Sequence, residues 1–177
     1  SAAAIAGTAV APAHAATCPS ASGVSVVVDF GGLGGGPETS CVSNGGGQSA
    51  AELSEVEHDL TRVTQFPGAV CRVDGLPADV DCSRMPPSDA FWGLFWSDGS
   101  GGWVFSSEGV DSLDVPAGGS VGWAWQTGGE PKEHPDVEPP RLEVGGVGGG
   151  RHLAVALLAR QPRLEVVLLG GRGAEVV

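Results

Sequence analysis

The sequence predicts a small α+β domain, built from several strands and one helix and stapled by disulfides, with a low-complexity tail. Three observations support this class: β-branched and aromatic runs between turn residues, one amphipathic segment with a helix-capping pattern, and four cysteines within the first 82 residues. The 177 residues include 30 glycines and 13 prolines, an excess typical of loops and linkers. One domain with tails accounts for this length.

The first sixteen residues are interpreted as the remnant of a signal peptide. Residues 1–16 are small and apolar, carry no acidic or basic side chain, and end in the letters AHA–A, a pattern that signal peptidase accepts. The stretch is too short to span a membrane. Cys18 raises a lipid-anchored alternative, but Thr17 fits poorly as the residue before a processed cysteine. The sequence therefore predicts an exported protein, secreted or held in the cell envelope.

Four cysteines in an exported chain indicate two disulfides, for which three pairings exist. Turn residues lie between Cys71 and Cys82 and would bring these two together. Cys18 precedes the first expected strand and Cys41 opens the second, so these two can meet across neighbouring strands. The favoured pairing is Cys18–Cys41 with Cys71–Cys82. A metal site is disfavoured, because the sequence contains no CxxC pair and no cluster of Cys and His.

Strands are predicted wherever β-branched and aromatic residues run between turn signals. Residues 23–30 give the strongest pattern. Further strands are expected at 40–42, 63–73, 91–96, 103–105, 110–115 and 120–126. In the last of these, large residues alternate with small ones, which predicts that one face buries aromatics while another backbone partly covers the other face.

One helix is predicted, beginning after Ser49. Ser49 and Glu52 have capping-box spacing, in which the hydroxyl and the carboxylate each accept a hydrogen bond from an otherwise unpaired backbone N–H. Leu53, Val56 and Leu60 recur on one face and form an apolar stripe. A helix this short must dock on a sheet to persist.

The net charge of −12 lies in the first 130 residues, which hold fifteen acidic and three basic side chains. Such an acidic surface repels phosphate backbones and anionic lipids, so nucleic acid is not an expected partner. The domain is expected to cover 17–127, followed by a Pro/Gly-rich linker at 128–150. The tail at 151–177 has two apolar runs divided by arginines, and neither is long enough for a membrane span.

The sequence contains no motif typical of an active site, and we predict that the protein is not an enzyme. The four histidines are scattered, and His58 is expected to be an exposed helix residue. A hydrolase would need a cleft with a perturbed carboxylate or histidine, which no pattern identifies. Asp74, Asp79 and Asp81 share a loop that could hold Ca²⁺, but their spacing does not match an EF-hand. No cofactor and no metal are predicted.

The five tryptophans are the best functional lead, and all lie between residues 92 and 125. Most are expected to form the core of a small domain. Five exceed what such a core readily hides, so one or two near the 97–102 loop are expected to be accessible to a flat ligand or a partner. The candidate ligand-binding residues are Trp92, Trp96, Trp103 and Phe105.

Three motifs carry a family resemblance: CRVDG at 71–75, the stretch from the two prolines at 86–87 to Trp96, and the stretch from Val115 to Trp125. Over roughly residues 23–126 the chain resembles the small C-terminal domain of transcobalamin and intrinsic factor, and most nearly its exported actinobacterial versions. The resemblance implies a β-grasp-like mixed sheet with one helix packed across it.

In the animal cobalamin carriers this domain works with an α-helical domain to enclose a corrinoid. This chain has no such helical domain, and its arginine-interrupted tail differs from the membrane anchor of many bacterial members. We expect a monomeric, non-catalytic, extracytoplasmic binding module for a corrinoid-like ligand or a cell-envelope partner. The alternative is a structural or protein-interaction domain displayed at the cell surface, with no small-molecule ligand.

Overall fold

The structure is a computed structural model that describes residues 18–141. The predicted signal-peptide remnant at 1–16, the later part of the predicted linker at 142–150 and the predicted tail at 151–177 lie outside the described residues.

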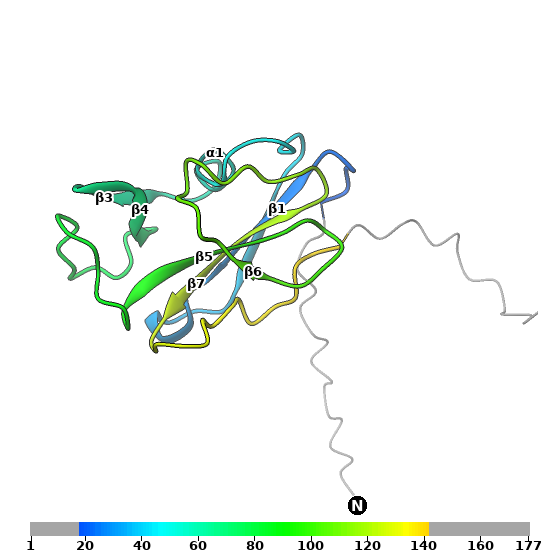
Figure 1. Cartoon of the computed structure of the whole chain (residues 1–177). Helices are drawn as coiled ribbons and strands as arrows, with labels where there is room; N and C mark the ends of the chain where they lie inside the picture. Colours follow the sequence, from blue (N-terminus) through cyan, green and yellow to red (C-terminus); the bar gives the residue numbers. More distant parts are fainter. Residues whose placement is uncertain (1–17, 142–177) are drawn as a thin grey trace, which may run out of the picture. The chain divides into compact units, whose positions relative to one another are not determined.

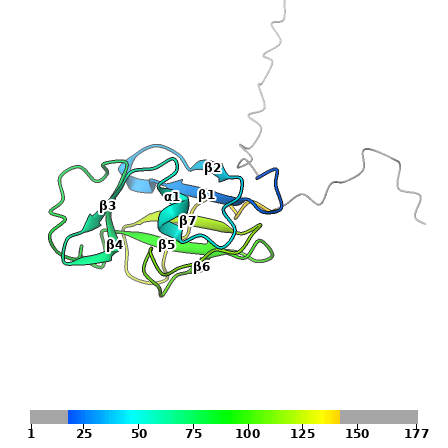
Figure 2. The ribbon, with the colours of Figure 1, turned by 90° about the horizontal axis from the view of Figure 1, so that it is seen from above.

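The strongest predicted strand forms β1 (Val24–Asp29), in which every residue is buried. β1 pairs antiparallel with β2 (Glu38–Val42) and parallel with β7 (Ser120–Gln126). β5 (Phe91–Ser97) and the two-residue β6 (Val104–Phe105) complete a five-stranded mixed sheet in the order β2-β1-β7-β5-β6 (Figures 1 and 2). The first and the last strand of residues 18–141 are therefore neighbours inside the sheet.

A separate two-stranded hairpin stands at one end of this sheet (Figure 1). It pairs β3 (Leu60–Val63) with β4 (Phe66–Val73) across a turn at residues 64–65. β4 corresponds to most of the strand predicted at 63–73. β3 arises from residues at the end of the predicted helical stripe, because the chain leaves the helix early.

The helix α1 (Ala50–Ser54) is shorter than its amphipathic pattern predicts, although its start is as expected. The Ser49 hydroxyl accepts a hydrogen bond from the Glu52 N–H at 3.3 Å, and the Glu52 carboxylate accepts one from the Ser49 N–H at 3.0 Å. Leu53 is fully buried, but Val56 is 53% exposed. The apolar stripe is therefore helical and buried over one turn only.

The segment 110–115 is not the strand that its sequence predicts. It forms a turn followed by a single bridge, and its carbonyl groups cap the helix instead. The N–H groups of Ala50 and Ala51 donate to the carbonyls of Leu113 and Val110 at 2.8 and 3.0 Å. These donors have no partner inside a helix, so the segment satisfies them while its apolar side chains enter the core.

The core lies between α1 and one face of the main sheet (Figure 2). The strands β1, β5 and β7 each contribute alternate side chains to it, as the period of two requires. Trp123 is the largest fully buried side chain. Its indole N–H donates to the Ser54 hydroxyl at 2.9 Å, and that hydroxyl donates to the Ala50 carbonyl at 2.7 Å. This chain of bonds fastens the helix to the sheet.

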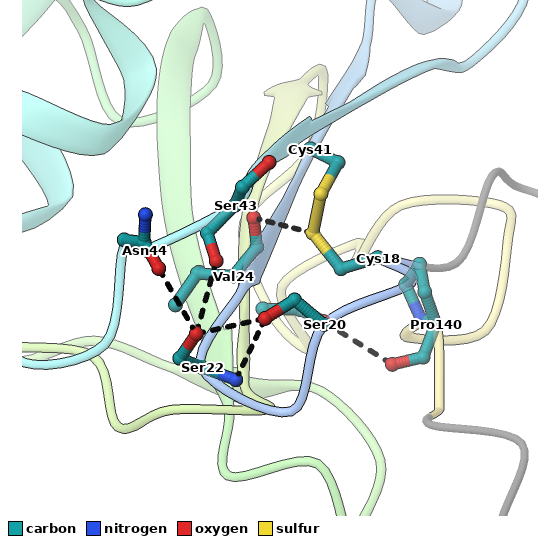
Figure 3. The surroundings of a disulfide bond; sticks show 9 residues. Cys18, Ser20, Ser22, Val24, Cys41, Ser43, Asn44 and Pro140 are labelled. Carbon is teal, nitrogen blue, oxygen red and sulfur yellow. Dashed lines mark hydrogen bonds between the residues drawn. A yellow bond between two sulfur atoms is a disulfide. The ribbon is translucent and has the colours of Figure 1, made fainter.

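The structure has the two disulfides of the favoured pairing, with Cα–Cα distances of 5.3 Å for Cys18–Cys41 and 5.6 Å for Cys71–Cys82. The first ties the start of the domain to β2, where the Ser22 hydroxyl also donates to the turn that follows the strand (Figure 3). The second closes the loop after β4. Each closed loop lowers the entropy of the unfolded chain and so stabilises the fold.

Residues 128–141, predicted as part of a linker, instead pack against the second face of the main sheet; we call them the strap. The Gln126 amide donates to the Glu133 carbonyl at 2.6 Å and accepts from the Glu133 N–H at 2.9 Å. The Asp29 carboxylate accepts from the Asp136 N–H at 2.7 Å. The strap therefore packs on the sheet beyond the boundary predicted at 127, because buried polar side chains on the strands bind its extended, proline-rich backbone.

The sheet face under the strap is lined by small residues, as the alternation in the last strand predicts. A Cβ atom added at Gly122 would lie 2.8 Å from the Trp103 ring and 3.1 Å from Pro135. The Trp103 indole N–H donates to the Val137 carbonyl at 2.7 Å. The alternation predicts a backbone that covers this face, and that backbone is the strap. The ring of Trp103 covers the face as well.

Candidate functional site

An apolar groove of about 610 Å³ opens between β4, the residues at 105–110 and the core face of β5. Its floor includes the buried side chains of Trp92 and Trp123. Three large apolar side chains on its wall are about half exposed: Phe66 (54%), Met85 (53%) and Phe105 (42%). A concave apolar site of this volume is typical of ligand pockets, and exposed apolar side chains gathered in one place mark binding surfaces.

Backbone hydrogen bonds fix the walls of the groove. The Val110 N–H donates to the Gly68 carbonyl at 3.0 Å and joins the two sides. The Ser106 hydroxyl accepts from the Glu108 N–H at 3.0 Å and donates to the Glu108 carbonyl at the same distance, which shapes the turn after β6. The walls are therefore formed before any ligand binds, as in most small-molecule sites.

One side of the groove is a stretch of unpaired sheet edge. β6 pairs only with Phe95 and Trp96, and the Ser106 N–H then donates to the Leu94 carbonyl at 2.8 Å. Beyond that bond, no strand in residues 18–141 pairs with the start of β5 on the side away from β7. Since backbone direction alternates along a strand, the N–H and C=O of Trp92 face the same open side as those of Leu94.

The structure brings together only two of the four predicted site residues. Trp92 lies in the floor of the groove, where its indole N–H donates to the Leu76 carbonyl at 2.9 Å, and Phe105 lies on the wall. Trp96 is partly buried against the core and does not line the groove. Trp103 lies on the opposite face under the strap, where its ring is beside Gly122 and its indole N–H donates to the Val137 carbonyl. None of the five tryptophans is exposed.

Two groove residues, Phe66 and Met85, are absent from the sequence-based prediction. Phe66 lies inside the strand predicted at 63–73, Met85 precedes the two prolines at 86–87, and each residue is followed directly by a proline. A large apolar side chain next to a proline in an expected turn is the signal that could have identified them, because turns lie at the surface and such side chains are rarely placed there without a contact.

His58 is not the exposed helix residue that the sequence predicts. It follows the end of α1, its side chain is 6% exposed, and its Nδ1 lies 2.7 Å from a carboxylate oxygen of Asp74. The same carboxylate accepts from the Asp59 N–H at 2.8 Å, so Asp74 serves the local turn. Within residues 18–141 no three His, Cys, Asp or Glu side chains are placed to hold a metal ion.

No family model matches the chain, and the curated proteins and solved structures gave no match. In the part of the chain that the structure describes, no helix is both long enough and apolar enough to cross a membrane. The two disulfides are compatible with an extracellular location.

Proposed function

We propose that the protein is a non-catalytic, extracytoplasmic binding module that holds its ligand in the apolar groove. The observation that carries this proposal is the gathering of Phe66, Met85 and Phe105 around a buried aromatic floor. When a ligand covers large apolar side chains that were exposed to water, the free energy of the system falls, which favours binding. Two disulfides support the extracytoplasmic part of the proposal.

The fold, in this proposal, is β-grasp-like, as the resemblance to the transcobalamin C-terminal domain implies. The strand order β2-β1-β7-β5-β6, the parallel central pair of first and last strands, and the single helix across one face support it. The same resemblance makes a flat, corrinoid-like molecule the first candidate ligand, and a cell-envelope protein the second.

Titration with cobinamide, followed by tryptophan fluorescence, tests the corrinoid version. Trp92 and Trp123 line the groove, so binding should quench their emission saturably after correction for the absorbance of cobinamide. The variant Phe105→Ser removes a wall residue and should abolish the effect. Val104→Ser, which changes an equally exposed neighbour outside the groove, should leave the effect intact. Absence of quenching at high micromolar cobinamide removes the corrinoid version.

A structural or protein-interaction domain without a small-molecule ligand is the second candidate, and one observation favours it. The indole N–H groups of Trp92, Trp103 and Trp123 all donate to acceptors inside the protein. These tryptophans therefore serve packing, and the aromatic cluster by itself does not require a ligand.

A further inference from the structure

We infer that the groove receives an extended peptide segment of a partner protein, which adds a strand to the open edge of β5. The segment carries apolar side chains at every second position and basic side chains between them. This inference rests on the proposed function and names the class of its ligand.

The unpaired edge determines the backbone conformation of the ligand. At the start of β5 the N–H and C=O of Trp92 face a side on which no described strand pairs with β5, and Trp92 itself lines the groove. A flat ring offers no backbone donor and acceptor to this edge, whereas an extended peptide can pair with both the N–H and the C=O of Trp92. Open edges of this kind are the usual sites of strand addition.

The groove beside this edge determines the side chains. Successive side chains of an added strand alternate between the two faces of the sheet, so every second one would enter the groove. There they would contact the half-exposed Phe66, Met85 and Phe105. Apolar residues at alternate positions of the ligand are therefore expected.

Charge determines the residues between the apolar positions. Residues 18–141 hold eighteen acidic and five basic side chains, and Glu108 is the only ionisable residue that lines the groove. Arg62 and Lys132 are each paired with a carboxylate, at 2.9 and 3.3 Å. A cationic segment is therefore attracted and an anionic one repelled.

The test uses the full chain and four synthetic heptapeptides with Lys at positions one, three, five and seven. The other positions are all Val, all Leu, all Phe or all Trp. Calorimetry should show binding tighter than 1 mM for at least one peptide. Two N-methylated forms of that peptide, modified at the Lys or at the apolar nitrogens, separate strand addition from simple apolar contact. One of the two should bind at least tenfold more weakly, because its methyl groups replace the donors that face β5.

Three further comparisons locate the site and the charge preference. Met85→Ser should weaken binding about tenfold, whereas Val56→Ser, an equally exposed apolar residue outside the groove, should not change it. Replacing each Lys of the peptide by Glu should also weaken binding at least tenfold.

The inference is overturned if no peptide binds, if both N-methylated forms bind as well as the parent, or if Met85→Ser leaves the affinity unchanged. The cobinamide titration distinguishes the two levels of the proposal. Quenching by cobinamide without peptide binding overturns strand addition and leaves the groove as a ligand site. If neither cobinamide nor any peptide binds, both strand addition and the groove as a ligand site are overturned.

Discussion

The two faces of the β5–β7 pair differ in how they are covered. On one face Gly93, Gly122 and Ala124 leave room for a backbone, and the strap occupies it. On the other face Trp92 and Trp123 lie in the floor of a groove whose wall is half exposed. The same two strands thus support a closed face and an open one.

The two faces differ in the polar groups that are available to bind another segment of chain. On the closed face the buried side chains of Gln126 and Asp29 both bond to backbone groups of the strap. Buried polar groups are stable only when paired in this way, so the strap and the strands depend on each other. On the open side no strand in residues 18–141 pairs with the start of β5, which leaves a place for a ligand.

The largest effect is expected on the closed face. Gly122→Leu would drive a side chain into the Trp103 ring and Pro135, and should destabilise the fold by about 3 kcal/mol, the upper range for overpacking. Urea unfolding measures this. Gly101→Leu is the matched control, because a Cβ at Gly101 meets nothing within 4 Å. Equal stability of the two variants would mean that the strap does not close this face.

Gln126→Ala should have the next largest effect. It removes both bonds to Glu133 and should destabilise the domain by about 1–2 kcal/mol. Amide hydrogen exchange should quicken at Asp136 in the strap before it quickens in β1. Gln48→Ala, which removes one bond from a partly exposed side chain, should change neither measurement appreciably.

The loop that carries Trp103 to the closed face should show a small pH effect. The backbone N–H and then the hydroxyl of Ser100, with the N–H of Gly101, lower the pKa of the Asp98 carboxyl. A lowered folded-state pKa stabilises the fold above the unfolded-state pKa of about 3.9, and the contribution is lost as the pH falls through the folded-state value. Asp98→Asn should therefore be less stable than wild type at pH 7.

The difference in stability between wild type and Asp98→Asn should narrow as the pH falls below about 4. Thermal melting between pH 7 and pH 2.5 measures it. Asp89→Asn is the control, because it makes the same change at an exposed aspartate outside this loop. A gap that is constant with pH would contradict the role given to the Asp98 carboxylate.

The smallest change in stability is expected on the open side. Met85→Ser should alter the free energy of unfolding by less than about 0.5 kcal/mol, because the side chain is 53% exposed. The same variant is expected to lose most of its peptide affinity. A large loss of stability would show that Met85 serves the core and not the groove.

Local patterns in the sequence predict much of the fold. The β-branched run of β1, the capping box at Ser49 and the turn residues between Cys71 and Cys82 each depend on near neighbours in the chain. Local sequence does not determine the structure of residues 110–115, because their apolar residues suit a strand and a core-facing turn equally. Only the distant α1 decides between the two.

The strap and most of the groove could not be predicted, because neither leaves a periodic pattern. A proline-rich segment reads as a linker unless the side chains that bind it are known, and Gln126 and Asp29 come from different strands. The groove joins Phe66, Met85 and Phe105 from three separate segments. Of the predicted tryptophans, Trp92 lines the groove, whereas Trp103 lies under the strap, whose position the sequence does not indicate.

An NMR titration of the ¹⁵N-labelled full chain, with the tightest-binding peptide of the series, tests the central claim most directly. Strand addition at the open edge of β5 predicts that hydrogen exchange at the Trp92 amide slows at least tenfold in the complex. Chemical shifts should change at Met85 and Phe105, while the strap stays unaffected. Unchanged exchange at Trp92, with the shift changes confined to the strap, would contradict the account.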